Sequence, residues 1–387
     1  MVSTNDLKEA ALQVLLHNLN GPYQGLPRTA GWGYPEPYTR DWMIAALGIM
    51  VTENAELMDG LRRLLTTLAN HQTRLGHIPS LANNPADRGA SDTTPLFLIA
   101  LALYRSVTGE ASFLEETVQK ALTWLDYQSP EDGGLVAQQP TSDWRDEQWI
   151  LGYGLYVNTL VYACARLYAR DERARSLQTL INQPGIRHIE KGQVVHAGLG
   201  LESKPYYALW VYKVHANERF DLLGNSLAIL FGIADSVKAN GIISWVEKTC
   251  DEMRTSGELA CALPPCLIPY IHPQDEDWRP RYQQFNQPGE YHNGGIWPFV
   301  IGFYIAALVA AGQAELAVEK FTIFSELVQV ARSSQQILGF NEWFRAQDGQ
   351  ACGQDWQTWS AAMYLFAEAC VDQKRVPIFP EWNQPSK

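Results

Sequence analysis

The sequence has few positive charges and no long apolar run. Its 30 Lys and Arg residues are outnumbered by 42 Asp and Glu residues, which gives a formal net charge of -12 without any basic cluster. We therefore expect neither a nucleic-acid nor a membrane partner, because binding phosphates needs a basic patch. The longest apolar stretches, 95–104 and 298–312, are shorter than the roughly 20 residues of a membrane span. Residues 1–6 lack the pattern of a signal peptide, so we expect a cytoplasmic location.

Motifs for metals and cofactors are missing as well. The six cysteines are scattered and lack the paired spacing of a zinc site or the density of a secreted disulfide scaffold. The eight histidines form no HExxH motif, and no glycine-rich phosphate loop follows a strand. We expect reduced, structural cysteines, no metal and no cofactor.

Aromatic residues are abundant, with 13 Trp, 17 Tyr and 13 Phe. Several of them stand beside a carboxylate, an amide or a guanidinium group, just before or inside the first turn of an apolar helix. These segments are 38–42, 143–146, 277–279, 291–298, and 341–343 with 355–359. Rings that stack on sugar faces and polar groups that hold hydroxyls are what a carbohydrate site needs. The sequence therefore predicts a small saccharide as the partner.

Helical periodicity runs along most of the chain, in segments of two alternating kinds. The amphipathic segments are 4–20, 55–72, 111–128, 171–183, 241–256 and 314–333. The segments that are apolar nearly all round are 39–53, 92–108, 153–169, 224–238, 294–311 and 355–371. This alternation predicts an all-α (α/α)6 toroid of about twelve helices, with an outer ring in water and a buried inner ring. We expect one domain over 1–387, with minor β-hairpin elements such as 191–198 and 206–214.

Acidic residues in the loops before the inner helices are candidates for hydrolysis of a glycosidic bond. That reaction needs one carboxylic acid to protonate the leaving oxygen and a second carboxylate to activate water or attack carbon. Asp92 and Asp355 also fit a helix-capping role. Asp146 and Glu342 do not, since each lies well before its helix and next to aromatic residues, which can raise the pKa of a carboxyl group. Spacing does not assign the two roles.

Several motifs, in the same order along the chain, resemble the neutral and alkaline invertases, glycoside hydrolase family 100. They are Arg40-Asp41-Trp42 against Arg-Asp-Phe, 219–225 against RFFTLGN, 275–279 against EYEDWR, 291–298 against YHNGGSWP, and 342–343 with 357–359 against PEYYD and YQTW. Debranching-type glucosidases and other (α/α)6 glycosidases are similar at a greater distance.

The resemblance implies roles for single residues. Asp146 stands where the invertases have MIDR and the debranching-type enzymes WMD, which is the position of the general acid, and Glu342 stands at the position of the base. Asp143 and Asp92 stay open as alternative acids. An inverting mechanism is implied, and the expected substrate-binding residues are Arg40, Asp41, Trp42, Asp92, Trp144, His292, Asn293, Trp297, Gln357 and Trp359.

The substrate is less well defined, and two other classes of function stay open. Residues 155–158 read Leu-Tyr-Val-Asn where the invertases have a Glu. We take sucrose as the first expectation, with an α-1,6-glucosidase of the debranching type or a trehalase-like hydrolase as alternatives. The other classes are an (α/α)6 sugar epimerase or isomerase, which would use histidines such as His77 and His292, and an inactive sugar-binding protein. Assembly into a homo-oligomer also stays open.

Overall fold

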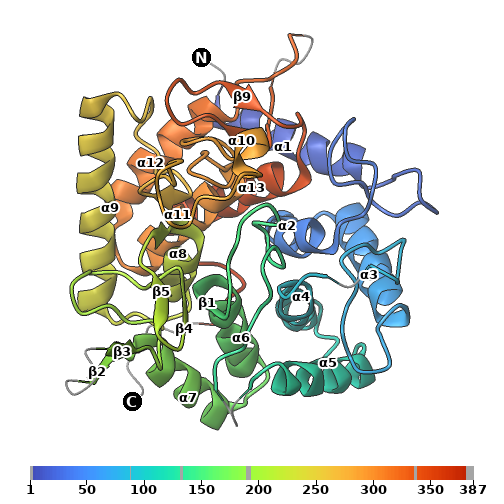
Figure 1. Cartoon of the computed structure of the whole chain (residues 1–387). Coiled ribbons are helices and arrows are strands. Elements are labelled where there is room, and N and C mark those ends of the chain that lie inside the picture. The colour runs from blue at the N-terminus through green and yellow to red at the C-terminus, as the bar shows by residue number, and fades with distance from the viewer. Residues whose placement is uncertain (1–2, 88, 131–133, 189–192, 335–337, 381–387) are drawn as a thin grey trace.

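Helices dominate the structure, a computed structural model that describes residues 3–87, 89–130, 134–188, 193–334 and 338–380 (Figure 1). The helices in these ranges are α1 (Thr4–Asn18), α2 (Thr39–Thr52), α3 (Ala55–Asn70), α4 (Thr93–Thr108), α5 (Glu115–Tyr127), α6 (Leu155–Leu167), α7 (Asp171–Asn182), α8 (Leu222–Leu230), α9 (Ser236–Ser256), α10 (Tyr282–Phe285), α11 (Pro298–Ala310), α12 (Ala314–Leu327) and α13 (Thr358–Gln373). Apart from the four-residue α10, these are the twelve helices that the sequence predicts.

Six helices form a closed inner ring. α2 contacts α4, α4 contacts α6, α6 contacts α8, α8 contacts α11, α11 contacts α13, and α13 returns to α2. Every residue of α11 except Ala310 is buried, as the apolar pattern of this segment requires. The ring closes tightly at Gly48 of α2, where an added Cβ would lie 2.0 Å from the carbonyl oxygen of Ala362 in α13. A side chain at this position would push the two helices apart.

The other six long helices, α1, α3, α5, α7, α9 and α12, lie outside this ring. Each buries one face only; α3, for example, buries Leu57, Leu61, Leu64 and Leu68, which recur every three or four residues. α3 packs on α2, α5 on α4, α7 on α6, and α12 on α11. In Figure 1 the inner helices surround the centre of the molecule, with α3, α5, α7 and α9 at its periphery. The predicted (α/α)6 toroid is confirmed.

One helix boundary was predicted wrongly. The apolar segment 224–238 is not a single helix: α8 ends at Leu230 and α9 begins at Ser236. Between them Gly232 has a positive φ of 72°, which ends the first helix readily because glycine has no Cβ. Asp235 then caps α9 by accepting a hydrogen bond from the backbone N–H of Lys238. The turn was not predicted because apolar residues stand on both sides of it.

Strands are short and antiparallel. They are β1 (Tyr153–Gly154), β2 (Ile186–His188), β3 (Gln193–Val195), β4 (Trp210–Tyr212), β5 (His215–Asn217), β6 (Phe220–Asp221), β7 (Leu267–Ile268), β8 (Trp343–Phe344) and β9 (Ala351–Cys352). They pair as β1-β4-β5, β2-β3, β6-β7 and β8-β9. β3 and β4 fall in the predicted segments 191–198 and 206–214, although 191 and 192 lie outside the described residues. The predicted minor hairpins are therefore present.

A membrane span needs a helix that is both long and apolar. Within the described ranges, no helix combines the two properties to the extent that crossing a membrane requires.

Candidate active site

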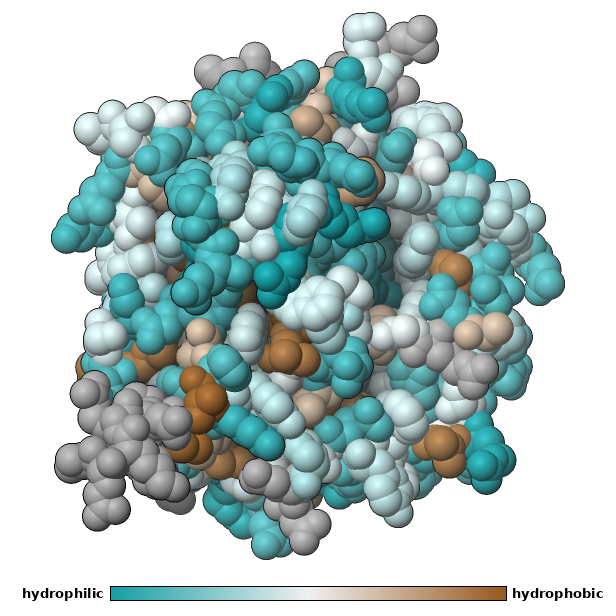
Figure 2. All heavy atoms as spheres, in the orientation of Figure 1, coloured by the Kyte–Doolittle hydropathy of each residue, from teal (hydrophilic) through white to brown (hydrophobic). Residues whose placement is uncertain are grey.

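A pocket opens among the loops that precede the inner helices. The face of the molecule shown in Figure 2 is hollowed near its centre, and hydrophilic residues line the hollow. The pocket is lined by Thr29, Tyr34, Tyr38, Arg40, Asp41, Trp144, Asp146, Tyr291, His292, Trp297, Glu342, Gln357 and Trp359.

The fold explains why these residues meet. Tyr38, Arg40 and Asp41 stand at the start of α2, and Trp144 and Asp146 lie in the loop before α6. Residues 291–297 directly precede α11, and the segment 342–359 leads into α13. Since the inner helices lie side by side in a ring, loops at their N-terminal ends converge at one mouth.

Nine of the twelve predicted site residues line this one pocket. They are Arg40, Asp41, Trp144, Asp146, His292, Trp297, Glu342, Gln357 and Trp359. Both predicted catalytic carboxylates are among them.

Three predicted binding residues do not line it, and each has a structural role. Trp42 is fully buried, and its Nε1 donates a hydrogen bond to the carbonyl of Arg28 at 3.0 Å. Asn293 is also fully buried, and its side chain bonds both the N–H and the carbonyl of Ile271. Asp92 is buried beneath Arg40. The structure thus places the polar groups of these three side chains against other parts of the protein rather than at the pocket.

Asp92 fixes the Arg40 guanidinium. Arg40 Nε and Nη2 donate to the two carboxylate oxygens of Asp92 at 2.6 and 3.2 Å, and Tyr156 Oη donates to the same carboxylate at 3.3 Å. Asp92 stands at the N-cap of α4, but its side chain bonds no helix N–H. A buried, two-point pair of this kind sets the orientation of the guanidinium. Arg40 is thereby aimed at the pocket.

Asp143, the other alternative acid, is also bound internally. Its carboxylate accepts hydrogen bonds from Gln138 Nε2 at 3.0 Å and from the backbone N–H of Arg145 at 2.7 Å, and it forms an ion pair with the Arg145 guanidinium. Burial opposes its ionisation, but Arg145 and these hydrogen bonds hold the pKa of Asp143 below its usual range. Such a group is ionised at neutral pH and does not donate a proton. Neither Asp143 nor Asp92 reaches the pocket.

Glu342 is held at the pocket wall by the residues that directly follow β9. Its Oε2 accepts a hydrogen bond from the backbone N–H of Gln354 at 3.0 Å. Gly353, with a φ of 74°, lies so close that an added Cβ would be 2.1 Å from this oxygen. Burial, followed by the nearby charges of Asp41 and Asp146, raises the pKa of Glu342 to about 8.

Asp146 forms no hydrogen bond or ion pair with any of the residues that the structure describes. Its side chain remains open to solvent at the pocket, whereas Glu342 is only 5% exposed. The surrounding protein nevertheless desolvates the carboxyl group and raises the pKa of Asp146 to about 6, although Arg40 acts in the opposite direction.

Asp41 is a third carboxylate in the same pocket. Its Oδ1 accepts a hydrogen bond from Gln357 Nε2 at 3.2 Å. Burial raises the pKa of Asp41 to about 7, and the neighbouring Arg40 limits the rise. Three carboxyl groups with raised pKa values in one pocket are typical of a site for proton transfer.

Indole rings form the walls. Trp144 meets Trp297 edge to face with ring centres 5.3 Å apart, and Trp359 stacks on Phe299 at 4.1 Å. His292 stacks on Trp297, and burial lowers the pKa of His292, so its ring is neutral. These contacts keep the rings rigid.

Several buried polar atoms of the pocket wall lack a hydrogen-bond partner within the described ranges. They are Trp144 Nε1, His292 Nδ1, Gln357 Oε1 and Trp359 Nε1. Buried polar groups are nearly always paired in proteins. Water or a ligand can supply the missing partners.

Four pocket residues were not among the predicted site residues. Tyr38 and Tyr291 lie inside the aromatic motifs, but Thr29 and Tyr34 lie in the connector 21–37, which has no helical periodicity. The only signal for this connector is its length and its content of glycine and proline, because long ordered loops are often functional.

The comparisons with known proteins agree with the resemblance seen in the motifs. Residues 201–374 match the family model described as alkaline and neutral invertase. Among curated proteins, the mitochondrial alkaline/neutral invertase C of Arabidopsis thaliana is 24% identical over 175 residues, which is 44% of this chain and 24% of that protein. The mitochondrial neutral/alkaline invertase 1 of Oryza sativa subsp. japonica is 28% identical over 163 residues, 41% of this chain and 24% of that protein.

These matches cover only part of the relatives and only part of the candidate site. The matched segment spans about a quarter of the length of these relatives. The family match also includes Glu342 and Gln357 but not Asp146 or Arg40. The resemblance to the invertases is therefore confirmed for 201–374, and the N-terminal half of the site is supported by its geometry.

Solved structures extend the similarity to nearly the whole chain. The mannosylglycerate hydrolase of glycoside hydrolase family 63 from Thermus thermophilus superposes with a TM-score of 0.62 at 15% identity, over 93% of this chain and 99% of that one. A bacterial glucoamylase complexed with acarbose also gives 0.62 at 15% identity, over 98% of this chain and 57% of that one. At this identity the likeness concerns the fold, and it supports the (α/α)6 assignment.

Proposed function

We propose that this protein is a glycoside hydrolase that cleaves a small saccharide with inversion at the anomeric carbon. The observation that carries the proposal is the meeting of Asp146 and Glu342, which are far apart in the sequence, in one pocket walled by indole rings. Both pKa values are raised, that of Asp146 to about 6 and that of Glu342 to about 8. Two carboxyl groups in such surroundings are the machinery of glycosidases.

In the proposed reaction, Asp146 donates its proton to the glycosidic oxygen while the bond between that oxygen and the anomeric carbon breaks. Glu342 removes a proton from a water molecule whose oxygen attacks the same carbon from the opposite face. One proton is thus given up and one is taken, and the two residues exchange protonation states in each turnover. Asp146 is the more accessible of the pair, which suits contact with a leaving group.

Arg40, Asp41 and Gln357 are proposed to hold hydroxyl groups of the reacting sugar. Arg40 is oriented by Asp92, and Asp41 is linked to Gln357, so the polar groups are preorganised before substrate enters.

Sucrose is the first proposed substrate, because the matched family consists of invertases. The structural neighbours include a mannosylglycerate hydrolase and a glucoamylase, which keeps debranching-type and trehalase-like substrates as alternatives. The sequence departs from the invertases at 155–158, and these residues open the inner helix α6 next to the site.

A reaction on a free sugar is the alternative of another class. An epimerase or isomerase would use His292. This residue is buried and neutral, and its Nδ1 has no hydrogen-bond partner among the described residues. The carboxylate pair favours hydrolysis, since an isomerase has no use for a proton donor placed opposite a base across a glycosidic bond.

A reducing-sugar assay across a panel of disaccharides tests the proposal. We expect purified protein to release reducing sugar from at least one α-linked disaccharide, and Asp146→Asn to abolish most of this release. Binding without release would indicate a sugar-binding protein, and conversion of a free sugar would indicate an isomerase. Either outcome would contradict the proposed function.

Three further expectations stay predictions. They are a single domain over 1–387, a cytoplasmic location, and assembly, if any, into a homo-oligomer. The relatives include mitochondrial, chloroplastic and cytosolic invertases, so similarity does not choose a compartment.

A further inference from the structure

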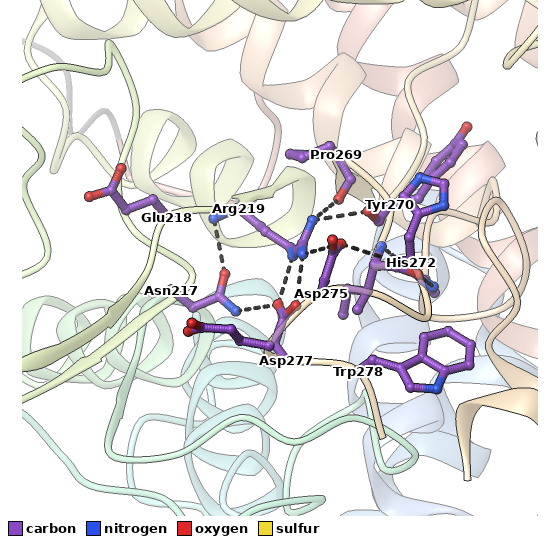
Figure 3. Close-up of polar contacts among 12 residues, drawn as sticks. Asn217, Glu218, Arg219, Pro269, Tyr270, His272, Asp275, Asp277 and Trp278 are labelled. Carbon is purple, nitrogen blue, oxygen red and sulfur yellow. Dashed lines mark hydrogen bonds and ion pairs between the residues drawn. The ribbon is translucent and has the colours of Figure 1, made fainter. Parts of the chain in front are cut away.

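Arg219 forms a clamp on the long connector 262–292, at a distance in sequence from every pocket residue. Its Nε and Nη2 bind Asp277 through two parallel hydrogen bonds of 2.7 Å, and Nη2 also bonds Asp275 at 2.8 Å. Nη1 donates to the carbonyls of Pro269 and Tyr270 at 3.1 and 3.0 Å. All five N–H donors of the guanidinium are therefore used on one segment, as Figure 3 shows.

The clamp is itself braced from both sides. Asn217 donates from its Nδ2 to Asp277 at 2.9 Å, and its Oδ1 accepts from the backbone N–H of Arg219. Asp275 also accepts from the backbone N–H of His272 at 2.9 Å. In Figure 3 the side chains of Asn217, Asp275 and Asp277 converge on Arg219. None of these residues lines the candidate active site.

The connector in turn holds the acid loop, residues 143–152, which contains Asp146. The contacts between the two segments are an ion pair of Arg281 with Glu147, a hydrogen bond from Trp149 N to Tyr282 Oη (2.9 Å), one from Asn286 Nδ2 to Glu147 O (3.4 Å), and one from Gln148 Nε2 to His292 O (2.9 Å). Next to the clamp, Trp278 packs edge to face on Tyr282 with ring centres 5.6 Å apart. The three residues after Asp146 are thus each tied to the clamped connector.

This arrangement matters because the Asp146 carboxyl group has no bonding partner of its own among the described residues. It forms no hydrogen bond and no ion pair with the part of the chain that the structure describes, so only the backbone of the acid loop sets its position. We propose that Arg219 is a positioning residue, which acts through the connector to place Asp146 against the glycosidic oxygen. The proposal rests on the proposed function of Asp146 as the acid.

The chemistry of arginine explains why this position needs it. A guanidinium group binds a carboxylate through two parallel bonds and keeps further N–H groups for carbonyls, whereas an ammonium group acts as a point charge with three donors. Arg219→Lys would keep the charge and lose the planar fork. A displacement of about 1 Å at a catalytic group can cost up to about a hundredfold in rate.

Arg170 provides a matched control. It binds Asp126 through two parallel bonds of 3.0 and 2.8 Å, between the outer helices α5 and α7 and away from the pocket. Arg170→Lys therefore removes a bidentate arginine–aspartate pair of the same type without touching the connector. Asp277→Asn serves as a second test variant, because it weakens the same clamp with little change in shape.

The first readout is activity with two kinds of leaving group. We expect Arg219→Lys to lose about ten- to a hundredfold in kcat on a disaccharide and far less on an activated aryl glycoside, which needs little help from an acid. Arg170→Lys should lose neither activity. Equal losses on both substrates would overturn the proposal, because general damage to the site also affects the step that depends on Glu342.

The second readout does not depend on activity, and it separates this proposal from the proposed function. Hydrogen–deuterium exchange should become at least about tenfold faster in peptides covering 146–150 of Arg219→Lys, and of Asp277→Asn, but not of Arg170→Lys. Unchanged exchange in both clamp variants would overturn the positioning role, even if the wild-type protein is an active glycosidase. Changed exchange in a protein that cleaves no saccharide would keep the mechanical link and reject the proposed function.

Discussion

Replacing Glu342 by glutamine should stabilise the protein, and increasingly so as the pH rises. The folded state raises the pKa of Glu342 from 4.5 to about 8, with burial as the largest cause. Ionisation of this group therefore favours the unfolded chain, and wild-type stability falls as the pH rises from about 4.5 to 8. Glutamine removes the ionisation and keeps an oxygen that can accept the hydrogen bond from Gln354.

The size of the effect follows from the shift. Between these two pKa values, each unit of pH above 4.5 costs the wild-type protein about 1.4 kcal/mol. At pH 7 the penalty is about 3 kcal/mol, and at pH 5 it is below about 1 kcal/mol. With an unfolding entropy of about 2.1 cal/mol/K per residue for 387 residues, 3 kcal/mol corresponds to a rise in Tm of about 4 °C.

Thermal melts of wild type and Glu342→Gln at pH 5, 6, 7 and 8 measure this directly. Glu326→Gln serves as the control, because Glu326 is exposed on α12. We expect the gain in Tm to grow with pH for Glu342→Gln and to stay near zero for the control. A gain in Tm that is the same at pH 5 and pH 8, or a loss at all pH values, would refute the argument that burial opposes ionisation of the Glu342 carboxyl group.

Three other predictions concern the reaction. Activity should follow a bell-shaped pH profile with limbs near 6 and 8, because the pKa values of Asp146 and Glu342 bracket the range in which the pair keeps one proton. Since Glu342 has the higher pKa, most of the pair carries this proton on Glu342, and the productive form, with Asp146 protonated and Glu342 ionised, is the minor one. A profile that is flat from pH 5 to 9 would contradict this prediction. Asp41→Ala should lower kcat/KM by about tenfold or more, since hydroxyl contacts tighten in the transition state, whereas a lowered Tm with unchanged kcat/KM would assign Asp41 a purely structural role. Proton NMR of the anomeric region in the first minutes should show the β-anomer released from an α-glycoside, and early accumulation of the α-anomer would indicate a covalent intermediate instead.

The ring of helices could be predicted because its signal is spread over many residues. Each inner helix is apolar nearly all round and each outer helix on one face, so a few ambiguous residues do not change the pattern. The boundary between α8 and α9, within 224–238, could not be predicted, since apolar residues stand on both sides of Gly232.

The site was predictable at the level of loops rather than of side-chain direction. Asp146 and Glu342 meet because both precede inner helices, which the periodicity already implies. Asp92 stands in an equivalent place, but its carboxylate turns to Arg40, and sequence gives no sign of this pairing. Asn293 belongs to a motif at the mouth, yet its amide bonds the connector. Tyr34 lies in a segment without periodicity, so only the three-dimensional structure brings it to the pocket.

The raised pKa values could not be ranked from the sequence either. Aromatic neighbours flank both Asp146 and Glu342, but the two groups differ in burial, and burial is the first cause of both shifts. That difference depends on the segment that directly follows β9, where Gly353 and the N–H of Gln354 enclose Glu342.

The central claim is that Asp146 and Glu342 act as acid and base in the hydrolysis of a glycosidic bond. The most direct measurement compares Asp146→Asn and Glu342→Gln on a disaccharide and on an activated aryl glycoside of the same sugar. We predict that both variants lose about 10²- to 10⁴-fold on the disaccharide, and that only Asp146→Asn recovers on the activated substrate. Full activity of either variant on the disaccharide, or recovery by Glu342→Gln instead, would contradict the account.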